Sequence, residues 1–92
     1  MTVPKRIEIR GKRWNLEVVD RLPDSSHGEI DPNDRPGKQI RIARNQNPLD
    51  LLDTVVHECL HAACPDLCEE AVTESATDIA KVLHRLGCRV RV

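Results

Sequence analysis

The chain has 92 residues, with 14 basic and 15 acidic side chains and a formal net charge of −1. This length fits a single domain, residues 1–92, whose core is small and, with one Trp and no Phe or Tyr, mainly aliphatic. No apolar run reaches the roughly 18 residues of a membrane span, and no apolar segment near the start resembles a secretory signal. We therefore expect a cytoplasmic protein, and its near-neutral charge argues against nucleic-acid binding.

The first half of the chain alternates between apolar and polar residues, as β-strands do. Residues 6–10 and 14–19 alternate on either side of Gly11, which predicts a β-hairpin. Residues 38–43 form another alternating segment, and Ile30 is expected on a short strand within a turn-rich stretch.

The second half begins with a helix signal. Asn47 is a typical N-cap, Pro48 is a typical first helical residue, and Asp50 adds an acidic group to the first turn. Apolar residues then recur at helical spacing, at positions 49, 52, 55, 56, 59, 60 and 63. Pro65 is expected to end this helix.

A second helix follows after a short loop. Asp66 and Glu69 have the spacing of a capping box, which predicts a helix that runs to about Leu86. Its expected buried stripe consists of Val72, Ala76, Ile79, Val82, Leu83 and Leu86. Gly87 is a typical helix C-cap, and residues 88–92 alternate as a short strand would. About three strands followed by two helices indicate the α+β class.

Residues 57–61, His-Glu-Cys-Leu-His, match the pattern H-E-x-x-H on the first predicted helix. Side chains four residues apart lie on one helix face, so both imidazoles can bind one metal ion. Glu58 lies about 100° around the helix, where its carboxylate can accept a proton from water without binding the metal. We predict His57 and His61 as ligands of one Zn²⁺ per chain and Glu58 as the catalytic general base.

A catalytic zinc ion needs a third protein ligand and an open coordination position. Glu70 and Glu74 point away from the apolar stripe of the second helix, whereas Glu69 lies at the edge of that stripe and has the capping role. We predict Glu70 as the third ligand. Glu74 is the alternative, either as the ligand or as a hydrogen-bond partner of a ligand histidine.

Cys64 and Cys68 bracket the loop between the helices and leave alternatives open. With His57 and His61 they would form a closed His2Cys2 zinc site, which leaves Glu58 without a function. They would also be able to form a reversible disulfide. The interpretation that we favour is that they are small reduced thiols, as is Cys59.

Hydrolysis of a carbonyl compound also needs a hydrogen-bond donor for the developing oxyanion. The chain has no Tyr, so the candidates are His27, Asn33 and the arginines of residues 24–44, and the sequence does not choose among them. The other histidine, His84, is expected at the surface.

The motif and its surroundings resemble the zincin metallopeptidases, and more narrowly the gluzincins, in which the two histidines and a Glu on the next helix bind zinc. The stretches 70–74, Glu-Ala-Val-Thr-Glu, and 74–78, Glu-Ser-Ala-Thr-Asp, both resemble the stretch that contains this Glu. Segments 28–32, 38–43 and 80–87 also resemble the minimal gluzincin-type domains of prokaryotes and phages.

This resemblance implies a small twisted sheet, an active-site helix and a backing helix, together with zinc-dependent hydrolysis of peptide bonds. It implies that residues 38–43 form the rim of the cleft, where a peptide substrate adds as an antiparallel strand. On this resemblance, we expect no counterpart of the second subdomain of large gluzincins among these 92 residues. The resemblance also allows a latent form in which residues 89–92 lie in the cleft.

Two other function classes are compatible with the sequence. A non-catalytic, zinc-stabilised module would bind a protein or peptide at the 38–43 edge and would not need Glu58. A DNA-associated accessory protein would use the basic residues of the first strands, Lys5, Arg6, Arg10, Lys12 and Arg13. The predicted function is a zinc metallopeptidase, because only this class uses the complete H-E-x-x-H pattern.

Overall fold

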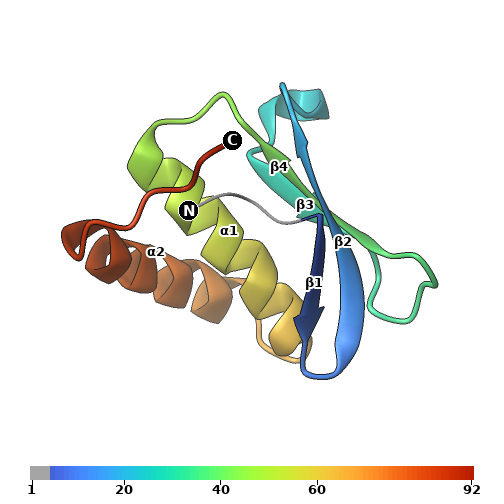
Figure 1. Cartoon of the computed structure of the whole chain (residues 1–92). Helices are drawn as coiled ribbons and strands as arrows, with labels where there is room; N and C mark the ends of the chain where they lie inside the picture. The colour runs from blue at the N-terminus through green and yellow to red at the C-terminus, as the bar shows by residue number, and fades with distance from the viewer. Residues whose placement is uncertain (1–4) are drawn as a thin grey trace.

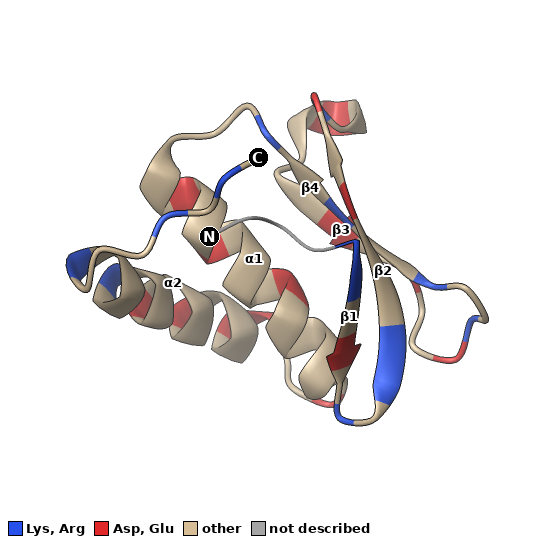
Figure 2. Cartoon of the chain, viewed as in Figure 1, with Lys and Arg blue, Asp and Glu red and all other residues tan. Residues whose placement is uncertain are grey.

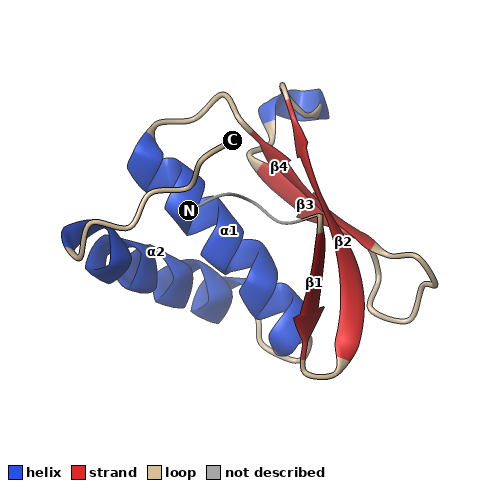
Figure 3. Cartoon of the chain, viewed as in Figure 1, coloured by secondary structure: helices blue, strands red, loops and turns tan. Residues whose placement is uncertain are grey.

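Four strands form one mixed sheet in the computed structural model, which describes residues 5–92. The strands are β1 (Arg6–Ile9), β2 (Lys12–Val19), β3 (Gly28–Ile30) and β4 (Gln39–Ala43). Their order in the sheet is β1-β2-β4-β3 (Figure 3), with a parallel pair β2–β4 and antiparallel pairs at both edges. The α+β class is confirmed, and the sheet has one strand more than the sequence predicted.

The β1–β2 hairpin turns at Arg10 and Gly11, whose φ angles are 50° and 77°. Two successive positive φ angles are typical of the type I′ turn, which matches the twist of paired strands. Arg10 also donates from Nη1 to the carbonyl oxygen of Ala63 at 2.8 Å, so the turn is attached to the end of a helix. The predicted hairpin is therefore confirmed.

Helix α1 spans Pro48–Ala63 and begins as the sequence predicts. The side chain of Asn47 accepts a hydrogen bond of 2.9 Å from the backbone N–H of Asp50, which caps the first turn. The helix ends two residues before Pro65, where the chain turns into a short loop.

Helix α2 spans Glu69–Arg85, and a short 3-10 helix, η1 (Pro23–Ser25), precedes β3. The predicted capping box is wrong, because the N-cap of α2 is Cys68 and no side chain caps this end. Gly87 has a φ angle of 90° and ends the helical segment as expected. Residues 88–92 do not form the predicted strand, since Arg91 alone among them makes a β-bridge. None of the described helices is long and apolar enough to cross a membrane.

The described elements form three layers, with α1 between the sheet and α2 (Figure 1). Helix α1 contacts β1, β3 and β4, whereas α2 contacts α1 and none of the described strands. The main core lies between the sheet and α1 and contains Trp14, Leu16, Ile40, Ile42 and Ala62. Because α1 is packed on two sides, the remaining side faces an edge of the sheet and is available for a site.

Strand β4 is an interior strand, which corrects the prediction that residues 38–43 form the free rim of a cleft. It has β2 on one side and β3 on the other. The edge on this side of the sheet therefore belongs to β3, whose three residues pair with Ile40–Ile42. A strand this short, in a stretch rich in turn residues, gives little sign of pairing in the sequence.

Helix α2 buries a narrower face than the apolar pattern predicts. Its buried residues are Val72, Ala76 and Ala80. Ile79, Val82 and Leu86 were expected to be buried, but their side chains are exposed, with 74% of Leu86 accessible. Because α2 packs on α1 alone, small alanine side chains at the contact are enough, and they allow the two helices to approach closely.

Candidate metal centre

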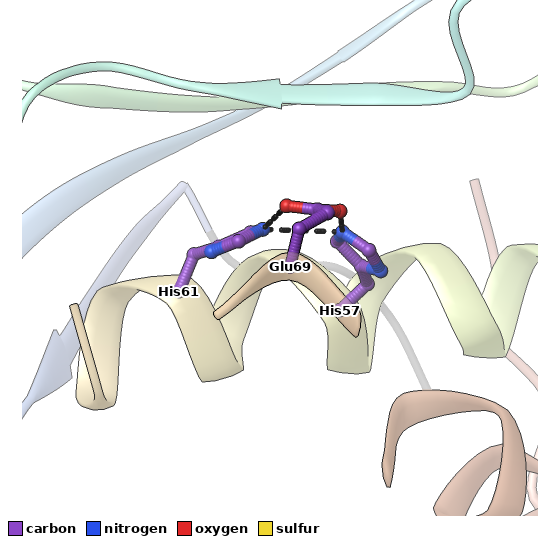
Figure 4. A group of neighbouring side chains, drawn as sticks. All are labelled: His57, His61 and Glu69. Atoms are coloured by element: carbon purple, nitrogen blue, oxygen red, sulfur yellow. Dashed lines mark hydrogen bonds and ion pairs between the residues drawn. The ribbon is translucent and has the colours of Figure 1, made fainter. Parts of the chain in front are cut away.

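Three side chains converge on one point beside α1: His57, His61 and Glu69 (Figure 4). The Nε2 atoms of the two histidines are 3.2 Å apart. The Oε1 atom of Glu69 lies 2.9 Å from Nε2 of His57, and its Oε2 atom lies 2.9 Å from Nε2 of His61. Ligand atoms at about 2.0 Å from a tetrahedral zinc ion are about 3.3 Å apart. The spacing therefore suits a metal ion bound by two imidazoles and one carboxylate.

The two histidines are placed by α1 itself. They lie one turn apart and are both half-buried. Their ring centroids are 4.8 Å apart and their planes differ by 67°, so the rings meet edge to face. The structure thus brings the two imidazoles together, as the spacing predicts.

The third member of the group is Glu69, where the sequence predicted Glu70. Glu70 and its alternative Glu74 are both exposed, and neither lines the cavity that contains the histidines. Glu69 extends from the first turn of α2 across the end of the interhelical loop to reach α1. The structure therefore replaces Glu70 with Glu69 in the candidate ligand set.

The rotation of α2 explains this difference. Glu69 lies on the same helix face as Val72 and Ala76, which pack against α1. The stripe inferred from the sequence also included the exposed residues Ile79 and Val82, which shifts its centre by roughly 50° from the buried face. With Val72 and Ala76 packed against α1, the side chain of Glu69 points at α1 and that of Glu70 points toward solvent.

Glu58 is buried beside this group, with 4% of its surface exposed. Burial raises its pKa to about 7; the charge of His57 lowers the pKa, and the carboxylates of Glu69 and Glu29 raise it. A carboxyl group with this pKa exchanges protons near neutral pH, as a general base and acid must.

Gly28 allows a strand to lie directly over Glu58. A Cβ atom at this position would lie 2.6 Å from Cγ2 of Thr54 and 3.1 Å from Oε2 of Glu58. Only glycine leaves room for this approach of β3 to α1. Sequence reasoning did not identify Gly28 as a site residue, and its one sign was its place in the segment 28–32.

Gln46 connects the start of β3 to α1. Its Nε2 donates to the carbonyl oxygens of Ala43 at 2.7 Å and His27 at 3.2 Å. Its Oε1 accepts a hydrogen bond of 2.8 Å from the hydroxyl group of Thr54. The position of the edge strand above Glu58 is therefore held by hydrogen bonds as well as by packing.

A cleft of about 590 Å³ lies between α1, the β3 region and the first half of α2. Its lining includes the three candidate ligands together with Glu58. The acidic residues of the lining are Glu29, Asp50, Asp53, Glu58 and Glu69, and no Lys or Arg of the described chain lines it. Figure 2 shows the same distribution, with acidic residues along α1 and the first half of α2, and basic residues at the β1–β2 hairpin and the end of α2. The charge of the cleft favours a bound cation.

Of the candidate oxyanion donors, His27 lines this cleft and the others do not. Asn33 donates to the carbonyl oxygen of Ala62 and accepts a hydrogen bond from Lys12. Arg41 donates to Glu29 and Asp31, both at 2.7 Å; the hydrogen bond to Glu29, together with the charges of Asp31 and Glu29, raises its pKa. The remaining arginines of residues 24–44 pair with Asp31 and Asp20.

All four cysteines are free thiols. Neither Cys64 nor Cys68 belongs to the metal-binding group found among residues 5–92. Cys59 is half-buried, and this burial raises the pKa of its thiol. Residues 88–92 do not line the cleft, so this structure does not have the latent arrangement.

No protein-family model, curated protein or solved structure matches the chain.

Proposed function

We propose that this chain is a zinc-dependent metallopeptidase domain that hydrolyses peptide bonds. The observation that carries the proposal is the buried carboxyl group of Glu58 in the same cleft as the His57, His61 and Glu69 group. Three protein ligands leave a coordination position open, as catalytic zinc sites do and structural sites do not. Two imidazoles and one carboxylate also suit zinc among the divalent metals.

The metal ion and the side chains of the protein have separate roles in the proposed reaction. When bound, zinc supplies a Lewis acid that polarises a carbonyl group and makes water nucleophilic near neutral pH. Glu58 would accept a proton from the attacking water and then donate it to the leaving amine, since its buried carboxyl group lies in the same cleft as the three candidate ligands. His27, at the cleft wall, is the proposed hydrogen-bond donor to the developing oxyanion.

The substrate backbone has a free strand edge to bind. The backbone groups of His27 and Asp31 form hydrogen bonds with β4. Since alternate residues of a strand face opposite edges, the N–H and C=O groups of Gly28 and Ile30 point away from β4. An extended peptide that pairs with these groups lies next to Glu58. The peptide-binding edge is therefore β3, in place of residues 38–43.

Metal content and hydrolysis together test this function. We expect protein purified without added metal to contain one zinc ion per chain and to cleave an unfolded protein substrate. Glu58→Gln should keep the zinc ion and lose at least about a hundredfold in kcat/KM, since it removes the general base. Glu70→Gln is the matched control, because it neutralises an exposed carboxylate outside the cleft.

Two outcomes would contradict the proposal. Hydrolysis that survives Glu58→Gln would indicate a contaminating peptidase or another mechanism. Full zinc binding without hydrolysis of any unfolded protein would favour the non-catalytic binding module.

A further inference from the structure

The cleft that contains His57, His61 and Glu69 is called the metal cleft below. A second cavity, of about 310 Å³, lies at one end of it. Its apolar walls come from three parts of the chain: Trp14 of β2, Ile30 and Pro32 at the end of β3, and Pro65 between the helices. His61 and Asn33 complete the lining together with Asp31. We call this cavity the Trp14–Pro65 pocket.

The Trp14–Pro65 pocket is continuous with the metal cleft. Ile30 and His61 line both cavities. The pocket therefore begins beside His61, at the edge of the metal group formed by His57, His61 and Glu69. The opposite end of the cleft is polar, and its walls there include Asp50 and Asp53 of α1. An apolar side chain beside the metal group therefore has one favourable place, which is the end next to His61.

Hydrogen bonds hold the loop wall of the pocket in position. Asn33 donates to the carbonyl oxygen of Ala62 at 3.3 Å, which attaches the β3–β4 loop to the end of α1. Lys12 donates from Nζ to Oδ1 of Asn33 at 2.6 Å, and Nζ of Lys38 lies 5.1 Å from the ring centroid of Trp14. Asp31, the acidic residue of the lining, is paired with Arg41 at 2.7 Å, so the ammonium group of a lysine side chain would find no free carboxylate partner in the pocket lining.

The direction of β3 relates the pocket to the substrate. The strand runs from Gly28, which lies over Glu58, to Ile30 at the pocket. A peptide that pairs antiparallel with β3, which is the more stable pairing, runs the opposite way. Its residues before the bond to be hydrolysed then lie at the pocket, and its residues after that bond lie at the polar end.

We infer that the Trp14–Pro65 pocket binds an apolar side chain, of the size of leucine, on the residue that precedes the hydrolysed bond. This inference rests on the proposed function, because it assumes that a peptide lies along β3 beside a bound metal ion. It assigns the substrate class as peptides with a bulky aliphatic residue at this position, and it disfavours Ala and Lys there.

Binding of short hydroxamates to the zinc-loaded protein tests the inference without turnover. The probes are N-acetyl-alanyl-leucine hydroxamate and its alanine and lysine counterparts, which place the variable side chain on the N-terminal side of the zinc-binding group. We expect the leucine probe to bind at least about tenfold more tightly than the alanine probe, because it buries three more carbon atoms. The lysine probe should bind no more tightly than the alanine probe.

Variants locate the preference in the pocket. Pro65→Asp places a charge at the exposed rim and should reduce the leucine-to-alanine affinity ratio to below about threefold. Pro32→Asp tests the same rim from the other loop if the first variant unfolds. Asp50→Asn, at the polar end of the cleft, is the matched control and should leave the ratio unchanged.

The outcomes separate this inference from the proposed function. Equal affinities for the leucine and alanine probes in zinc-loaded protein would overturn the inference and leave the metallopeptidase proposal intact. A leucine preference that Pro65→Asp removes would support the pocket even if no peptide is hydrolysed, and the proposal of hydrolysis would then fail alone. A preference that survives both proline variants would also overturn the inference.

Discussion

Helices α1 and α2 both contribute to the metal group, but different features of the chain position them. Helix α1 is capped by Asn47 and packed between the sheet and α2, with Thr54, Glu58 and Ala62 buried. Helix α2 has no side-chain cap at its start and packs on α1 alone. The two histidines are thus placed within a single helix, whereas Glu69 reaches them only when α2 has the correct rotation.

This difference implies that the two kinds of ligand respond to different changes. The relative position of His57 and His61 depends on one helical turn. The position of Glu69 depends on the small residues between the helices and on a five-residue loop, residues 64–68. Substitutions on each helix therefore test whether the position of each ligand is set by packing between the helices or by the local sequence.

The largest effect should come from the α2 ligand itself. Glu69→Ala removes one of three candidate ligands and should weaken zinc binding by at least about a hundredfold, a factor that loss of a supporting hydrogen bond alone can reach. Glu70→Ala should change zinc affinity by less than about twofold, because Glu70 is exposed and outside the cleft. Competition with a chromogenic chelator measures both. A larger loss in Glu70→Ala would show that α2 is rotated by one residue relative to this structure.

The next effect concerns the close approach of β3 to α1. Gly28→Ala brings a methyl group within 2.6 Å of Cγ2 of Thr54 and should lower the free energy of unfolding by about 1–3 kcal/mol. Thr54→Ser removes that methyl group and retains the hydroxyl group that donates to Gln46. In urea unfolding, Gly28→Ala should therefore cost less in the Thr54→Ser background. Independent, additive effects of the two substitutions would argue against this contact.

The helix–helix contact should tolerate less change than the exposed face of α2. Ala76→Leu should cost about 1–3 kcal/mol and weaken zinc binding as well, because α2 must move to admit the larger side chain. Ile79→Ser, on the exposed flank, should change the free energy of unfolding by less than about 0.5 kcal/mol. Thermal unfolding of both variants, each with and without zinc, measures the change in stability and the change in zinc binding. A larger effect for Ile79→Ser than for Ala76→Leu would mean that Ile79, as the apolar pattern of the sequence indicated, lies in the contact between α1 and α2.

The smallest effect is the pH dependence that Glu58 gives to the metal-free protein. Its pKa of about 7 lies above the ordinary value of 4.5, so the folded state retains a proton that the unfolded chain releases. This contribution is fully present below about pH 4.5 and is lost as pH rises through 7.

Glu58→Gln should therefore make the metal-free protein more stable than the wild type above pH 7, by about 1–2 kcal/mol. The two proteins should be closer in stability at pH 4, where the wild-type carboxyl group is protonated. Urea unfolding in the presence of a chelator at both pH values makes the comparison, because a bound cation would lower the pKa. Parallel stability curves for the two proteins would show that Glu58 is not desolvated.

Much of the fold follows from contacts between residues close in sequence. The hairpin depends on alternation and on Gly11, and the start of α1 depends on the Asn47 cap. The pairing of β3 with β4 depends on residues about ten positions apart in an irregular stretch, so the sequence indicated only a short strand at Ile30. For the same reason, the complete sheet order was needed to identify β3 as the edge strand beside Glu58.

The candidate site divides in the same way. By itself, the sequence determined that His57 and His61 share a face of α1 with Glu58 close by, because one helical turn decides this arrangement. The tertiary structure decided that Glu69 completes the group, that Gly28 covers Glu58, and that an apolar pocket lies beyond His61. Neighbouring residues of a helix are about 100° apart, so a modest rotation of α2 exchanges Glu70 for Glu69. That rotation is set by packing between helices, where small alanines form the contact and larger apolar residues remain exposed.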